Sequence, residues 1–131
     1  MGCAYTGGNA RRRINGSLKI GIVWSKDTPS ARHQNLRQSE PSWEPYDTYI
    51  QMPNATKAEC EIVESYARMM VERTFPECKN VGNDHFDFPI VGNKNEQEAN
   101  YFAHIIQFYV DACELFHISY KVIQKAYKRR Y

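Results

Sequence analysis

The first six residues carry the most specific chemical pattern in this chain. Gly2 is followed by Cys3 and, at position 6, by Thr6. After removal of an initiator Met, Gly at position 2 with Ser or Thr at position 6 is the pattern read by N-myristoyltransferase, and an adjacent Cys is a common palmitoylation site. The pattern predicts lipidation of Gly2 and Cys3, on the condition that Met1 is removed.

Basic residues near this pattern would strengthen such an anchor. A lone myristoyl chain binds a bilayer with an association constant on the order of 10⁴ M⁻¹, so stable anchoring needs a second acyl chain or a basic patch. Cys3 would supply the second chain, and Arg11, Arg12 and Arg13 would supply the patch. If Met1 is retained, we interpret the same thirteen residues as a basic arm bound by a neighbouring protein.

Asp84-His85-Phe86-Asp87 places an imidazole between two carboxylates, which is the start of a metal site or a general-base pair. No second cluster supplies further ligands. His104 and His117 are too far apart in sequence to share one ligand site on a helix. Cys113 and His117 are i, i+4 neighbours, but no orienting third group or oxyanion site accompanies them. We therefore predict no catalytic residue, no metal site and no cofactor.

Composition places the chain among single-domain proteins with a modest core. The 131 residues have a net charge of +2, and the charge is uneven. Residues 1–26 and 121–131 contain basic and no acidic residues, whereas the middle of the chain is acidic. Basic ends, including Lys128, Arg129 and Arg130, suit an anionic membrane surface or an acidic protein partner. The acidic middle makes a nucleic-acid partner unlikely.

Cysteine spacing argues against a cysteine metal site, and hydropathy argues against a membrane-spanning helix. The four Cys residues have no metal-ligand spacing, and without a secretory signal peptide free thiols are the default, although a Cys60–Cys78 disulfide stays open. No apolar run approaches the roughly 20 residues of a spanning helix.

Three zones follow from the patterning. Residues 1–16 read as a basic N-terminal arm, residues 17–53 as an irregular or extended segment, and residues 54–131 as a helical hairpin domain. Alternation of apolar residues predicts a short β element around 17–24, and residues 46–52 are a candidate second strand. The expected fold class is mainly α, with two antiparallel helices, an extended N-terminal arm and at most this short β element.

The first helix is predicted over about 55–75. Thr56 and Glu59 have capping-box spacing, Asn54 is an alternative cap, and Pro76 supplies the stop. Residues at helical spacing are predicted to pack in the core: Ile62, Tyr66, Met69 and Met70.

The second helix is predicted over about 96–128, because apolar residues recur at helical spacing almost to the C-terminus. The residues predicted to pack are Phe102, Ile106, Tyr109, Phe116 and Tyr120. Further apolar residues widen the surface beyond one stripe, namely Phe108, Val110, Leu115, Ile118 and Val122. One face can therefore pack on the first helix while another remains for a partner.

Phe88-Pro89-Ile90-Val91 resembles the short late-domain motif of some paramyxovirus matrix proteins, which recruits budding machinery. Together with an acylation signal, the resemblance implies a membrane-bound, viral matrix-like protein.

Two functions are expected from these patterns. The first is a non-enzymatic accessory or structural subunit, bound to other subunits of a larger, membrane-associated assembly, with a mitochondrial respiratory complex as one candidate. The alternative is a myristoylated and palmitoylated peripheral membrane adaptor, or a viral matrix-like protein, on the cytoplasmic leaflet.

Overall fold

We describe the protein from a computed structural model. The structure describes residues 2–5, 11–12, 17–19, 21–24, 43–44, 48–80, 85–89, 92 and 94–124, with side chains for most residues from 48 to 123. This part is mainly helical. Its largest elements are the helices α2 (Lys57–Thr74) and α3 (Lys94–Leu115), of 18 and 22 residues.

Short strands form two antiparallel sheets beside the helices. The first sheet has the order β4 (Gly21–Trp24), β1 (Gly2–Tyr5), β6 (Thr48–Met52) and β9 (Lys121–Gln124). The second has the order β5 (Trp43–Glu44), β2 (Arg11–Arg12), β3 (Ser17–Lys19), β8 (His85–Asp87) and β7 (Lys79–Asn80). In the first sheet, Ile50 of β6 lies opposite Ala4 of β1 on one side and Val122 of β9 on the other.

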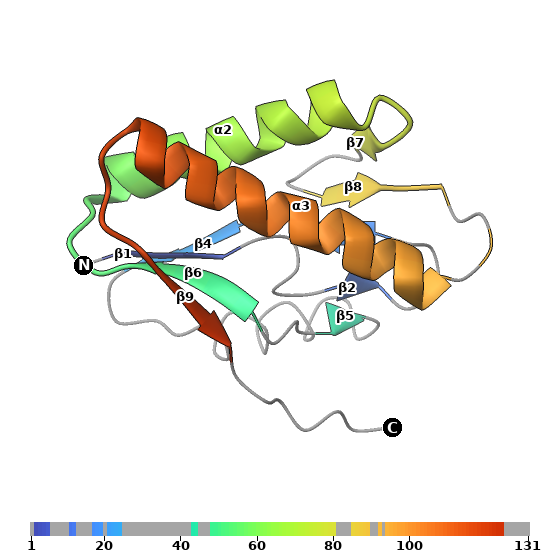
Figure 1. The fold of residues 1–131 in the computed structure, drawn as a ribbon, viewed down its shortest axis with the longest axis horizontal. Coiled ribbons are helices and arrows are strands. Elements are labelled where there is room, and N and C mark those ends of the chain that lie inside the picture. Colours follow the sequence, from blue (N-terminus) through green and yellow to red (C-terminus); the bar gives the residue numbers. More distant parts are fainter. Residues whose placement is uncertain are drawn as a thin grey trace.

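Both helices cover the same face of the strands and run in opposite directions (Figure 1). Helix α2 packs on β1, β4 and α3, and α3 packs on β6. The predicted pair of antiparallel helices is therefore present. Because β6 and β9 pair over four residues, the expectation of at most one short β element around 17–24 is wrong.

Helix α2 begins where the sequence predicts. Thr56 is the N-cap, and its hydroxyl accepts a hydrogen bond from the Glu59 amide at 3.1 Å. The Glu59 carboxylate in turn accepts the Thr56 amide proton at 3.0 Å, which completes a capping box. The helix ends at Thr74 with Phe75 as its C-cap, directly before Pro76. The predicted helix over 55–75 is confirmed.

Helix α3 ends much earlier than residue 128. His117 adopts a left-handed backbone conformation, with φ of +55°. Its amide bonds to the Glu114 carbonyl at 3.4 Å, and the Ile118 amide bonds to the Cys113 carbonyl at 2.8 Å. This pair of bonds is a Schellman motif, which closes the last turn and turns the chain away from the helix axis.

The chain then returns to the sheet as β9. Residues Lys121 to Gln124 continue the helical spacing of apolar residues, but they pair with β6 instead. Ile118 is 7% exposed and anchors the turn in the core, which directs the following residues toward β6. The prediction of one helix over 96–128 is therefore corrected to a helix, a Schellman turn and an edge strand.

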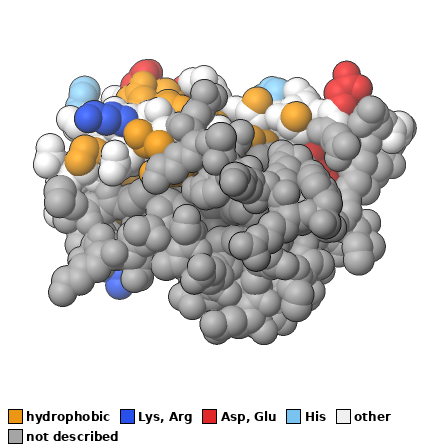
Figure 2. All heavy atoms as spheres, turned by 90° about the horizontal axis from the view of Figure 1, so that it is seen from below, with side chains coloured by type: hydrophobic (Ala, Val, Ile, Leu, Met, Phe, Trp, Pro, Cys, Tyr) orange, Lys and Arg blue, Asp and Glu red, His pale blue; other side chains and the backbone are white. Residues whose placement is uncertain are grey.

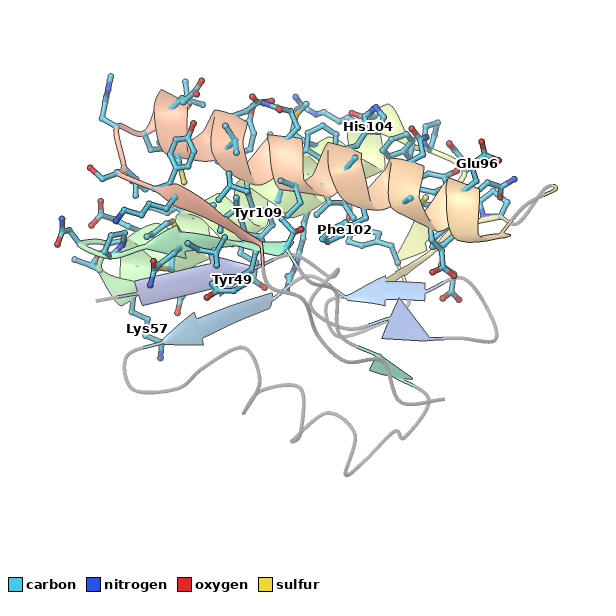
Figure 3. The ribbon with its side chains drawn as sticks, turned by 60° about the horizontal axis from the view of Figure 1, so that its bottom comes forward. Tyr49, Lys57, Glu96, Phe102, His104 and Tyr109 are labelled. Atoms are coloured by element: carbon cyan, nitrogen blue, oxygen red, sulfur yellow. The ribbon has the colours of Figure 1, made fainter. Side chains whose placement is uncertain are left out.

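The core lies between the helices and β6. Its central residues come from four elements: Ile50 and Met52 of β6, Cys60, Val63, Ala67 and Val71 of α2, Phe86 of β8, and Phe102, Ile105, Phe108, Tyr109, Ala112 and Cys113 of α3. Figure 3 shows Phe102 and Tyr109 on the side of α3 that faces the strands. In the described residues, no helix is long and apolar enough to span a membrane.

Candidate functional site

Among the residues whose side chains the structure describes, four large apolar ones remain exposed toward one end of the molecule. Leu115 is 58% exposed, Phe116 43%, Ile62 46% and Val122 46%. We call these four residues the apolar patch. Figure 1 shows that the first turns of α2, the last turn of α3 and the start of β9 lie together at this end.

Ring contacts and hydrogen bonds hold the patch in shape. The rings of Tyr66 and Phe116 meet edge to face, with centroids 6.2 Å apart and planes at 89°. Ile62 lies one helical turn before Tyr66, so the contact connects the α2 and α3 parts of the patch. The Tyr120 hydroxyl donates to the Glu114 carboxylate at 2.9 Å, which ties the loop before β9 to the last turn of α3.

The Schellman turn explains why these apolar residues face solvent. It ends α3 directly after Leu115 and Phe116, so no further helical turn covers them. Figure 2 shows hydrophobic side chains of described residues reaching the surface of the molecule. Exposed apolar residues that gather at one place often mark a surface where another protein binds.

The predicted packing residues divide into three groups. Phe102 and Tyr109 are buried in the core. Those that are partly buried are Tyr66, Met69, Met70, Ile106 and Tyr120. Ile62 and Phe116, also predicted to pack, are exposed, although the Phe116 ring contacts Tyr66 of α2. Among the residues that widened the apolar surface, Phe108 and Ile118 are buried whereas Leu115 and Val122 are exposed. The burial of each side chain shows which apolar residues remain at the surface. Helical spacing alone could not predict this distinction.

All of the predicted lipid and membrane residues lie outside the part with described side chains. The backbone of Gly2 and Cys3 belongs to β1, between β4 and β6, where Gly2 lies opposite Trp24 and Met52. Of the basic residues, Arg11 and Arg12 have a described backbone in β2. Those outside the described residues altogether are Arg13, Lys128, Arg129 and Arg130. Lipidation of Gly2 and Cys3 therefore stays a prediction.

The histidine and carboxylate pattern at 84–87 falls on β8. Phe86 is 2% exposed and part of the core, while Asp84 and the side chain of His85 lie outside the described residues. In the described part of the chain, no group of three His, Cys, Asp or Glu residues could hold a metal ion. His104 lies on the outer side of α3 (Figure 3), and its Nδ1 donates to the Asn100 carbonyl at 2.8 Å.

The described thiols are unsuited to nucleophilic chemistry. Cys60, Cys78 and Cys113 are free, so the open Cys60–Cys78 pairing is absent. Burial raises the pKa of Cys113 to about 12, with a further contribution from Cys60. His117, its i+4 neighbour, has a structural role at the end of α3. Since the thiolate is the nucleophile, this burial disfavours nucleophilic chemistry at Cys113.

The Phe88–Val91 segment is only partly described. Phe88 is 4% exposed and packs against Tyr101, with ring centroids 4.7 Å apart. Pro89 is exposed, and Ile90 and Val91 lie outside the described residues. The aromatic ring of the segment is therefore a core residue in this structure.

Comparison with protein-family models, with curated proteins and with solved structures finds no match to this chain.

Proposed function

We propose that the protein is a non-enzymatic subunit that binds another protein through the apolar patch. The exposure of Leu115 and Phe116 carries the proposal. These two residues end a helix whose position is set by a buried core on one side and a Schellman turn on the other. A partner would meet a preformed surface, so little conformational entropy would be lost on binding.

Protein partners fit this surface better than small molecules do. The patch spans two helices and an edge strand, and Phe116 is of the aromatic type that is enriched at the centre of protein interfaces. Polar groups border it: the Glu114 carboxylate, the Tyr120 hydroxyl and Lys121 lie within the same segment. An apolar centre with a polar border is the usual anatomy of such an interface.

Three statements stay predictions from the sequence. They are the membrane association of the resulting assembly, its mitochondrial location, and the alternative of a lipidated adaptor. They depend on the basic clusters and on Gly2 and Cys3, whose side chains are outside the described part. The proposed protein-binding role does not depend on them.

Photo-crosslinking in the native cell tests the proposal. A photoreactive phenylalanine analogue at position 116 should give one discrete adduct with another protein chain. The matched control carries the analogue in place of Glu72, which is exposed near the end of α2, away from the patch. We expect no such adduct from position 72. Equal adduct patterns from both positions, or none from position 116, would contradict the proposal.

A further inference from the structure

We draw no further inference here: the strongest candidate, the outer edge of strand β9 beside the apolar patch, where Val122 is 46% exposed, carries nothing because no feature of the described residues shows what covers it.

Discussion

The ring of Phe116 meets the ring of Tyr66 edge to face, with centroids 6.2 Å apart and planes at 89°. The contact joins the end of α3 to the first half of α2 at the edge of the apolar patch. Such aromatic pairs contribute about 0.5–1.5 kcal/mol beyond the area that they bury. The contact therefore holds the Phe116 ring against α2.

A double-mutant cycle measures this contact directly. Y66A, F116A and the double variant should show a coupling of about 0.5–1.5 kcal/mol in the free energy of unfolding, because each single substitution removes the same ring pair. Urea denaturation of the four proteins provides the values. Additive losses, within about 0.3 kcal/mol, would show that the rings do not stabilise each other.

The left-handed backbone conformation of His117 at the end of α3 predicts that glycine at this position stabilises the protein. His117 has φ of +55° and an exposed side chain. H117G should raise the free energy of unfolding by about 0.5–1 kcal/mol, since glycine adopts this conformation without strain. H117V should lower it by about 1 kcal/mol or more, because β-branched residues fit this region poorly. Thermal unfolding of the three proteins checks the order, and a valine variant as stable as the glycine variant would contradict it.

The capping box at the start of α2 predicts a loss on removal of one hydroxyl. T56A should cost about 1 kcal/mol, because the Glu59 amide loses its acceptor. T56S keeps the hydroxyl and should cost much less. Chemical denaturation distinguishes these outcomes, and equal losses for the two variants would show that the hydroxyl does not cap the helix.

The features that could be predicted from the sequence are those that depend on residues close together in the sequence. The start and end of α2 depend on Thr56, Glu59 and Pro76, which are neighbours in sequence, and the prediction of this helix was accurate. The end of α3 depends on His117 in a conformation usually taken by glycine, while apolar spacing continues through Ile123. Nothing local marks that stop, so the predicted helix ran too far.

The other differences between the predicted and the observed fold involve pairing between segments that are far apart in the sequence. β6 pairs with β9, and the two strands are about seventy residues apart in sequence. Each strand is short, and the residue pattern of one strand does not indicate which other strand it pairs with. The hydrogen bond from Tyr101 to Glu77 could not be predicted for the same reason, since the two residues are 24 positions apart in the sequence and meet only in the folded chain. The helical spacing predicted a wide apolar surface on the second helical segment, but of the residues named for it Phe108 and Ile118 are buried, so the spacing could not tell which residues stay exposed.

The buried thiols predict a stability that falls at high pH. Burial raises the pKa of Cys60 to about 11 and of Cys78 and Cys113 to about 12, with added effects of Glu59 on Cys60 and Glu77 on Cys78. An unfolded thiol has a pKa of about 8.5. Because folding raises these values, the stability they contribute is complete below about pH 8.5 and is lost as pH rises toward 11–12.

Two measurements test this prediction: the reactivity of the thiols, and the melting temperature of a C78S variant. In a C3S background at pH 8, a chromogenic disulfide reagent should react slowly with the native protein and quickly with three thiols in urea. The C78S variant should show a smaller fall in melting temperature between pH 8 and 10 than its parent. Rapid reaction of Cys60 and Cys113 in the native protein would contradict their burial.

A binding measurement on patch variants tests whether the apolar patch is a protein-binding surface. The partner captured by crosslinking at position 116 should be purified and titrated calorimetrically with the full chain, with L115S/F116S and with E72Q. The double variant should bind at least about tenfold more weakly, since it removes two exposed apolar side chains from the centre of the interface. E72Q should bind as the parent does. Unchanged affinity of the double variant, with its fold intact by circular dichroism, would contradict the account.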